Sequence, residues 1–385
     1  MSNTRKFMLH GFFSYLLLGL FSTGFSVAIP IIRAEFQLNY EAIGIVLTMN
    51  SIGFLLGSLC GGISVEKLSL KITNTLGLVL APVGLFLLIT AKTLPVFGFG
   101  NFLVGFGCSF LETGIPPLAS FFSKKTARLL NLLHSFFSLG ALASPVVFSL
   151  LTHFDLNWRF LFGGMIVFFV LDLYLILTLK IEGEFRPSKI ESKEGLRFFT
   201  SPFFWIIGIG VAFYVASELA ISSWAPTYAV DIFEYAPTAA AFLPTFFWIG
   251  LFIGRLVSAA FVERFSPYRW LLLVTSLGLP IVLLNQIPAR PLFYFYGMTF
   301  LAGIVHSSIY PTFQALLVQH IDAGKGYALG VFASMGALGG FASGYLVGAT
   351  SERFGIRAGF FSIFIYFVCT FVCSVILYRM TRKRE

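Results

Sequence analysis

Apolar residues occur in twelve long runs along the chain, and short polar stretches separate these runs. A helix that crosses the hydrocarbon core of a bilayer needs about 20 predominantly apolar residues. The pattern therefore predicts twelve membrane-spanning helices. They cover residues 8–32, 41–65, 72–91, 95–122, 129–151, 158–180, 203–229, 239–262, 270–287, 291–318, 326–350 and 356–378.

The longest polar stretch, residues 181–201, divides the twelve runs six and six. It reads IEGEFRPSKIESKEGLRFFTS and carries charges of both signs. We therefore expect an N-terminal six-helix bundle over residues 1–180, a cytoplasmic linker over 181–201 and a C-terminal six-helix bundle over 202–385.

Composition agrees with a polytopic membrane protein of the all-α class. Of the 385 residues, 57% are hydrophobic and only 11% are charged, whereas soluble domains carry about 25% charged residues. The four cysteines lie inside apolar runs and are expected to be packing residues. The chain shows no phosphate-binding loop, zinc-type Cys/His spacing or nucleophile elbow, so we expect neither an enzyme nor a metal or cofactor.

The distribution of Lys and Arg predicts the orientation. With a cytoplasmic N-terminus, 19 of the 26 basic residues lie in inner segments. Six lie in outer segments, and Arg255 lies inside a helix. Because basic residues favour the cytoplasmic side, both termini are predicted to be cytoplasmic.

The net charge of +9 then faces an anionic lipid leaflet, and a nucleic-acid partner is not needed to explain it. The short loops and polar tails indicate a bacterial inner membrane. We expect a monomer whose partners are membrane lipids, protons and a small-molecule substrate.

The two halves of the chain repeat each other. GFLLGSLCGGISVEKLS from Gly53 matches GLFIGRLVSAAFVERFS from Gly250 at a shift of 197 residues. FSLGALASP (137–145) matches ASMGALGGF (333–341) at a shift of 196. Six spans separate the copies, so both start on the same side of the membrane. Such a parallel repeat is typical of a transporter with a binding site between two halves.

The segment GISVEKLSLK (62–71) resembles the motif between helices 2 and 3 of the major facilitator superfamily. Gly62 matches the motif's glycine, and Glu66-Lys67 takes the place of its Asp-Arg pair. The repeat places Glu263-Arg264 at the equivalent position in the second half. We expect gating or structural roles for these five residues and for Arg255.

The segment GCSFLETGIPP (107–117) resembles helix 4 of the fucose–galactose–proton symporter family. Residues 131–145 resemble helix 5 of the same family, and residues 214–228 and 246–255 resemble helices 7 and 8 of its bacterial glucose–proton symporter branch. Glu112 matches the family's membrane glutamate, which implies a role in proton coupling. Ser26 stands where the fucose member has a helix 1 aspartate, so a scheme that uses a helix 1 carboxylate cannot be carried over.

Three carboxylates lie inside predicted spans. Helical rise places Glu112 about 16 Å, Asp172 about 12 Å and Glu218 about 22 Å from the cytoplasmic ends of their helices. A charge at the bilayer centre costs about 3 kcal/mol or more unless it meets a cavity or a partner. A carboxyl that is dry in one state and wet in another binds its proton differently in the two states. We therefore assign proton coupling to Glu112 and Glu218, with a hydrogen-bonding role as the alternative, and favour helix packing for Asp172.

Polar and aromatic side chains in other spans are candidates for substrate binding. Indole and phenol rings suit the apolar faces of sugars, while amide and imidazole groups suit hydroxyls. Each of them has packing as its alternative role. The candidates are Asn50, Asn101, Asn131, His134, Trp224, Tyr228, Trp248, His306 and Tyr310.

Spacing along the helices bears on two possible pairs of polar residues. His306 and Tyr310 are spaced as i, i+4 partners on one helix face. Arg255 and Glu218 differ in depth by about 12 Å, so we expect no direct ion pair between them.

These patterns predict a twelve-helix secondary transporter that moves a small organic solute. The resemblance implies a hexose-type sugar carried by proton symport. A proton-coupled exporter of drugs or metabolites on the same scaffold is the alternative. A further alternative is a membrane sensor that does not transport a solute.

Overall fold

A computed structural model describes residues 3–37, 40–180, 197–287, 291–321 and 323–382. Every regular element in these residues is helical. The first half contains α1 (Asn3–Glu35), α2 (Tyr40–Lys67), α3 (Leu70–Thr90), α4 (Leu94–Phe122), α5 (Thr126–His153) and α6 (Arg159–Thr178). The second half contains η1 (Arg197–Thr200), α8 (Pro202–Phe233), α9 (Pro237–Ala240), α10 (Leu243–Phe261), α11 (Pro267–Leu284), α12 (Leu292–His306), α13 (Ile309–His320), α14 (Lys325–Phe354) and α15 (Ile356–Arg382).

Twelve helical segments in the described residues are long and apolar enough to span a membrane, which confirms the predicted number. The predicted tenth helix is formed by α12 and α13 in succession, with a turn at Ser307 and Ser308 between them. Most of the expected linker, residues 181–196, lies outside the described residues.

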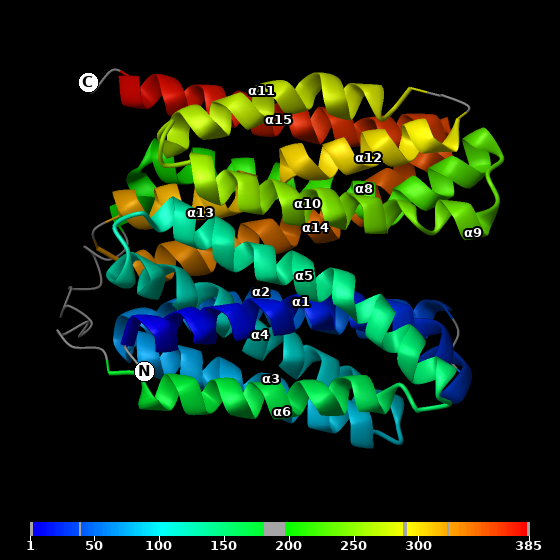
Figure 1. Cartoon of the computed structure of the whole chain (residues 1–385), viewed down its shortest axis with the longest axis horizontal. Coiled ribbons are helices and arrows are strands. Elements are labelled where there is room, and N and C mark those ends of the chain that lie inside the picture. Colours follow the sequence, from blue (N-terminus) through cyan, green and yellow to red (C-terminus); the bar gives the residue numbers. More distant parts are fainter. Residues whose placement is uncertain (1–2, 38–39, 181–196, 288–290, 322, 383–385) are drawn as a thin grey trace. The chain divides into compact units, whose positions relative to one another are not determined.

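The chain forms two compact units. The first comprises residues 1–124, 136–197 and 321–334, and the second comprises 125–135, 198–320 and 335–385. The helices α5 and α14 therefore contribute residues to both units. In the first unit α4 packs along α2 and α3, and α6 packs along α1 and α3 (Figure 1). In the second unit α10 packs along α12, and α15 packs along α8 and α11.

The internal repeat is confirmed by equivalent close packing in the two units. A Cβ atom on Gly53 of α2 would overlap the Phe102 carbonyl oxygen of α4. A Cβ atom on its counterpart Gly250 of α10 would overlap the Phe300 carbonyl oxygen of α12. Only glycine lets two helix backbones approach this closely. The repeated sequence motif thus encodes a repeated helix–helix contact.

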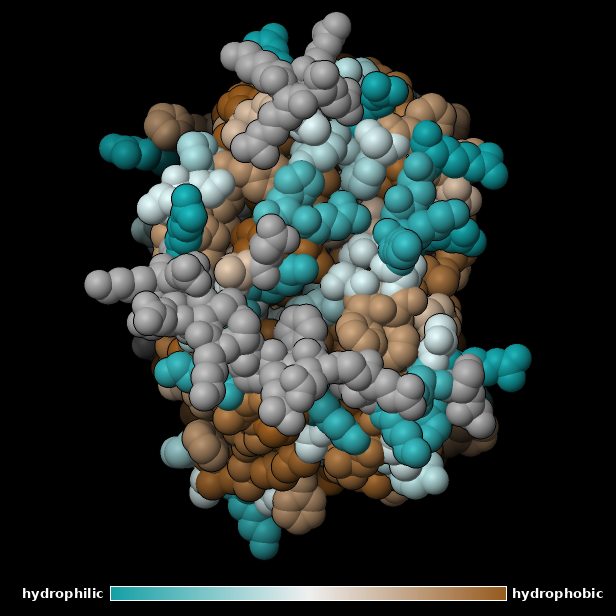
Figure 2. All heavy atoms as spheres, turned by 90° about the vertical axis from the view of Figure 1, so that its left-hand side faces the viewer, coloured by the Kyte–Doolittle hydropathy of each residue, from teal (hydrophilic) through white to brown (hydrophobic). Residues whose placement is uncertain are grey.

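Large apolar side chains are exposed along the helices, as a lipid-facing surface requires. On α6 they include Phe160, Val167 and Val170. Figure 2 looks onto the helix ends drawn at the left of Figure 1, where hydrophilic side chains gather. This separation of apolar helix sides from polar helix ends is the pattern of a membrane-spanning bundle.

An exposed ion pair joins α1 to the start of α6. Arg159 donates two hydrogen bonds to the Glu35 carboxylate, at 2.9 and 2.6 Å. The Trp158 indole N–H donates to the same carboxylate at 2.7 Å. The hydrogen bonds from Arg159 hold the pKa of Glu35 below its usual range.

Candidate functional site

Glu112 lies in the most deeply buried stretch of α4. Every residue from Gly107 to Ala119 is buried, and Glu112 itself is 6% exposed. Pro116 and Pro117 lie inside the helix, which continues past them to Phe122. Because proline lacks an N–H, these two residues remove backbone hydrogen bonds one turn after Glu112. The membrane carboxylate therefore stands beside a locally weakened segment of the helix.

Glu218 of α8 and Arg255 of α10 form an ion pair, so the expectation that they would not pair is wrong. Arg255 Nη2 lies 3.7 Å from Glu218 Oε1, and both side chains are buried. Backbone depth alone separates the two residues by about 12 Å. Side chains lean toward the N-terminus of their own helix, and these two helices are predicted to cross the membrane in opposite directions. The two long side chains therefore lean toward each other and close the gap.

Arg255 also binds two backbone carbonyls within the second unit. Its Nε donates to Ser307 O at 3.1 Å, and its Nη1 donates to His134 O at 2.8 Å. The Ser307 carbonyl follows the last residue of α12, where backbone carbonyls have no N–H donor within the helix. A guanidinium is favourable there because the helix dipole is negative at its C-terminus. Arg255 thus connects α8, α10, α5 and the end of α12.

His134 and Tyr310 belong to the same cluster. The His134 Nε2 atom lies 3.1 Å from the Gln314 Oε1 atom, and because that oxygen only accepts, the ring nitrogen is the donor. The His134 ring lies 5.4 Å from the Tyr310 ring, which lies 6.2 Å from that of Tyr214. Sequence patterns did not single out Gln314, although an amide in an apolar helix is a usable signal.

His306 is a packed and fully satisfied residue. It is 0% exposed, its Nδ1 lies 2.8 Å from Ala302 O, and its Nε2 lies 2.9 Å from Ser217 Oγ. The predicted i, i+4 relation with Tyr310 is interrupted, because α12 ends at His306 and α13 begins at Ile309. Tyr310 instead faces His134, and His306 contacts the Phe367 ring at 4.8 Å.

Several buried polar atoms of the second unit make no hydrogen bond with any described residue, and two of them lie near the residues of this cluster in sequence. They are Asn131 Oδ1, one turn before His134 on α5, and Thr312 Oγ1, one turn after Ser308 on α13. The amide nitrogen of Asn131 is occupied by Ala127 O at 2.9 Å. A buried acceptor or hydroxyl without a partner costs about 1–3 kcal/mol. Polar atoms of this kind suit a hydroxyl-bearing ligand.

Three predicted binding residues are held in structural contacts. Asn50 donates to Asn101 O at 2.9 Å, and Asn101 donates to Val46 O at 2.8 Å, so both join α2 to α4. The Tyr228 hydroxyl donates to Gln286 O at 2.9 Å, and its ring stacks on Phe360 at 4.2 Å. Packing explains all three.

The two remaining aromatic candidates, Trp248 and Trp224, also belong to the second unit. Trp248 is buried on α10, with its ring 6.1 Å from that of Phe247. Trp224 lines an open groove of about 780 Å³ between the ends of α8 and α14, together with Asp231, Tyr345 and Glu352. Trp224 is therefore not part of the Arg255 cluster.

The repeated Glu-Lys/Arg motifs place carboxylates at helix N-termini. In the first unit Glu66 Oε1 accepts a hydrogen bond from Gly326 N–H at 2.6 Å, in the first turn of α14. In the second unit Glu263 Oε1 accepts from Arg128 N–H at 3.2 Å, in the first turn of α5. Both contacts satisfy an unpaired N–H and place negative charge where the helix dipole is positive.

Other residues of these motifs have different surroundings. A Cβ on Gly62 would overlap the Gly326 carbonyl oxygen, so Gly62 permits the close approach of α2 and α14 within the first unit. Lys67 is exposed. The Arg264 guanidinium lies 5.3 Å from the centre of the Phe261 ring.

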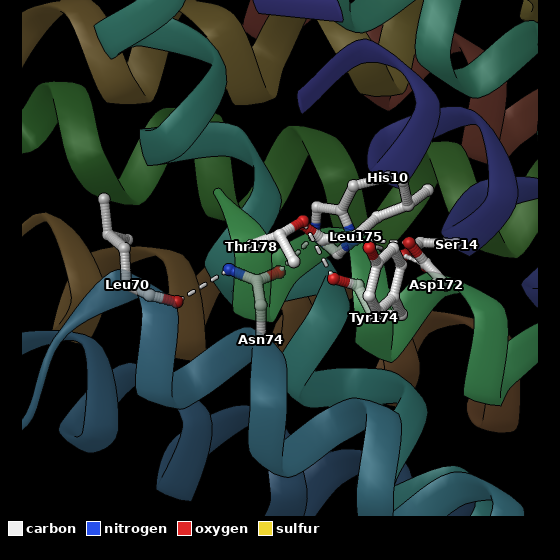
Figure 3. A network of polar contacts seen from close by, with 8 residues as sticks. All are labelled: His10, Ser14, Leu70, Asn74, Asp172, Tyr174, Leu175 and Thr178. Carbon is white, nitrogen blue, oxygen red and sulfur yellow. Dashed lines mark hydrogen bonds and ion pairs between the residues drawn. The ribbon is translucent and has the colours of Figure 1, made fainter. Parts of the chain in front are cut away.

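A polar cluster that the sequence patterns did not reveal lies in the first unit (Figure 3). His10 and Ser14 of α1, Asn74 of α3 and Asp172 of α6 are all 0% exposed and in mutual contact. Asp172 joins helices, as predicted. The spacing of His10 and Ser14 on one face of α1 was an available signal.

Comparison with known proteins gives relatives along nearly the whole chain. The putative glucose/galactose transporter of Helicobacter pylori is 25% identical over 360 residues, which cover 88% of this chain and 87% of the relative. The protein TsgA homolog of Buchnera aphidicola subsp. Baizongia pistaciae is 20% identical over 382 residues, which cover 97% and 95%.

A solved structure agrees with the fold. The Escherichia coli fucose:proton symporter matches with a TM-score of 0.84 at 19% identity, over 98% of this chain and 99% of that chain. The sequence profile of the family described as Major Facilitator Superfamily matches residues 11–285. That match covers more than half of the chain and confirms the resemblance carried by the motif at Gly62, so the chain belongs to the major facilitator superfamily.

Proposed function

We propose that this protein is a secondary active transporter that moves a hexose-type sugar by proton symport with alternating access. The observation that carries the proposal is the buried Glu218–Arg255 pair inside an apolar helix bundle. Buried charges within membrane helices mark substrate or ion pathways. The names of the relatives support a sugar: one is a putative glucose/galactose transporter, and a structural neighbour carries fucose with protons.

Protonation of Glu218 would change the Arg255 cluster directly. The ionised carboxylate attracts the guanidinium, and the neutral acid loses most of that attraction. The 3.7 Å separation exceeds the usual 2.7–2.9 Å of a charge-assisted hydrogen bond, so another group can compete with Arg255 for the Glu218 carboxylate. Arg255 keeps its two carbonyl contacts in either case. A proton on Glu218 therefore releases the ion-pair contact between α8 and α10, while Arg255 stays hydrogen-bonded.

The polar groups around this pair suit a sugar. Gln314, His134 and Asn131 offer amide and imidazole groups, and Tyr310 offers an aromatic face. Hydroxyls of a hexose both donate and accept, so they match the buried acceptor Asn131 Oδ1.

Glu112 is the second proposed proton carrier, in the first unit. It is buried in α4, where an ionised carboxylate is costly, and the neutral acid is tolerated. One proton that crosses 100 mV supplies about 2.3 kcal/mol. That free energy supports roughly 50-fold accumulation of a neutral solute.

The test is uptake of labelled glucose, galactose and fucose into proteoliposomes under an inward proton gradient. Wild type is compared with Glu112→Gln and Glu218→Gln, and the exposed Glu234→Gln is the matched control. We expect gradient-driven accumulation by wild type and the control. The variant that lacks the proton carrier should only equilibrate or exchange the sugar.

Three outcomes would change the proposal. If no sugar moves, hexose transport is wrong, and proton-coupled export of other solutes is tested next. If sugar equilibrates in wild type but never accumulates, proton coupling is wrong. If a Gln variant accumulates sugar as wild type does, that carboxylate is structural.

A further inference from the structure

The polar cluster of the first unit joins three helices far from the Arg255 cluster in sequence and in a different unit. His10 Nδ1 lies 2.8 Å from Asp172 Oδ1, and the Ser14 hydroxyl donates to Asp172 Oδ2 at 2.6 Å. His10 Nε2 lies 3.2 Å from Asn74 Oδ1. Figure 3 shows the His10 ring between Asn74 and Asp172.

The hydrogen-bond pattern determines the protonation of one ring nitrogen. The Asn74 amide nitrogen donates to Leu70 O at 2.8 Å, which leaves the Asn74 oxygen facing His10. That oxygen is an acceptor only, so His10 Nε2 must carry a hydrogen. A neutral imidazole has one N–H, and therefore Nδ1 of a neutral His10 is a bare acceptor.

The contact between Nδ1 and Asp172 then requires a further proton. If Asp172 is ionised and His10 is neutral, two acceptors face each other at 2.8 Å without a hydrogen between them. A proton on either atom removes this conflict and makes a hydrogen bond of ordinary length. With that proton, the pair carries no net charge, whether the proton is on the imidazole or on the carboxyl. A buried pair of zero net charge avoids most of the cost of an isolated buried carboxylate.

We propose that His10 and Asp172 form a proton-binding site in the first unit that holds one proton shared between Nδ1 and Oδ1. The site is separate from the carboxylates assigned to coupling, and the proposal does not rest on the proposed transport function. Loss of the proton would leave α1 and α6 with facing acceptors. The bound proton is therefore what lets α1 and α6 pack together at this depth.

Charged groups near the site come from two of the helices packed around it. Lys6 of α1 donates to Thr178 O at 2.9 Å, and Lys71 of α3 donates to Leu177 O and Leu179 O at 2.7 and 3.0 Å. Both ammonium groups therefore bind the last carbonyls of α6, about 9 Å along the helix from Asp172. On α4, Gly114 faces the site, because an added Cβ there would meet the Asn74 amide at 2.7 Å, and Glu112, two residues earlier, points to a different side of that helix. The two lysines would oppose retention of the proton.

The test counts protons released when the full chain, purified in detergent, is unfolded with SDS at pH 8 in the presence of a pH-indicator dye. In the unfolded chain an aspartate and a histidine lose their protons below this pH. In Asp172→Asn the new amide donates to His10 Nδ1, so the contact is kept without an extra proton. We expect wild type to release about one proton more per chain than Asp172→Asn, because only the wild-type pair holds that proton when folded. The exposed Asp155→Asn is the matched control and should release as many protons as wild type.

The same comparison predicts that the stability of wild type relative to Asp172→Asn falls as the pH rises. The folded wild type binds one proton more than folded Asp172→Asn, and the unfolded chains bind equal numbers above pH 5. The folding equilibrium constant of wild type relative to the variant should therefore fall about tenfold per pH unit between pH 5 and 8.

Equal proton release by wild type and Asp172→Asn would overturn the proposal, as would a ratio of folding constants that does not change with pH. If Asp172→Asn does not fold, the double variant His10→Leu/Asp172→Leu replaces it, because apolar residues of similar volume often substitute well for a buried ion pair. That variant should also release about one proton fewer than wild type, and equal release would again contradict the site.

Discussion

Buried polar side chains of this protein act in groups that span several helices. Arg255 contacts Glu218, Ser307 and His134, which lie on or at the ends of three other helices. His10 likewise contacts residues of α3 and α6. Because lipid offers no hydrogen bonds, each such group must be satisfied within the protein. The loss of one member therefore affects every helix that the group joins.

We expect the two members of the Glu218–Arg255 pair to differ in their contribution to stability. Arg255→Gln removes the contacts to Glu218, Ser307 and His134 and leaves Glu218 without its cation, so it should lower the free energy of unfolding by about 3–5 kcal/mol. Glu218→Gln keeps a polar group beside Arg255, which retains both carbonyls, so the loss should be about 1–2 kcal/mol. Unfolding in SDS–detergent mixtures measures both, and the exposed Arg379→Gln is the control. A larger loss for Glu218→Gln than for Arg255→Gln would show that the carbonyl contacts contribute little.

Helix pairs in both units pack through glycines at repeated positions. Gly53 and Gly57 of α2 approach the backbone of α4, and their counterparts Gly250 and Gly254 approach that of α12. Helices in lipid gain no hydrophobic free energy by associating, so close van der Waals contact has to supply it. The repeated glycines are therefore packing positions.

A methyl group at these glycines should disrupt the helix pairs. Alanine favours a helix over glycine by about 0.5–1 kcal/mol, yet a Cβ on Gly53 or Gly250 would overlap a carbonyl oxygen of the neighbouring helix. We expect Gly53→Ala and Gly250→Ala to lower the folded yield and the unfolding free energy by about 2 kcal/mol or more. Gly297→Ala on α12 is the control, because nothing lies within 4 Å of its added Cβ. Normal folding of both Gly53→Ala and Gly250→Ala would mean that the helices separate easily at these contacts.

The molecule as a whole carries two copies of one helical plan and an asymmetric distribution of charge. The packing of α2 on α4 recurs as α10 on α12, and that of α3 on α6 recurs as α11 on α15. Basic residues concentrate in the segments at one predicted side of the membrane. An even number of spans places both ends of the chain on the same side.

This topology is directly testable with reporter fusions in bacteria. We expect a fluorescent protein fused to either terminus to fluoresce in the cytoplasm, and alkaline phosphatase inserted after Asp155 to be active in the periplasm. The excess of Lys and Arg in the inner segments is the physical reason. Active phosphatase at either terminus would reverse the predicted orientation, and opposite results at the two termini would contradict twelve spans.

Patterns along the chain predicted the helical elements well, whereas the contacts of the candidate site residues depend on other helices. Apolar runs of the right length gave all twelve spans, because a membrane helix must satisfy its own backbone and expose apolar side chains. The repeat located Gly53 and Gly250, and the position of Glu112 in a buried helix follows from its apolar neighbours. The contacts of candidate residues such as Asn50 and Tyr228 could not be read from the sequence, because their partners lie on other helices.

The sequence by itself determined the helical class, the number of spans, the repeated halves and the family, since these depend on local hydropathy and on motifs within single segments. The tertiary structure alone decided which polar groups meet. Glu218 pairs with Arg255 because their side chains lean toward each other from adjacent helices. His10 of the first helix contacts Asp172 of the sixth. Those contacts join residues 37 to 162 positions apart in the chain, and their distances depend on helix direction, tilt and side-chain reach, which no linear pattern records.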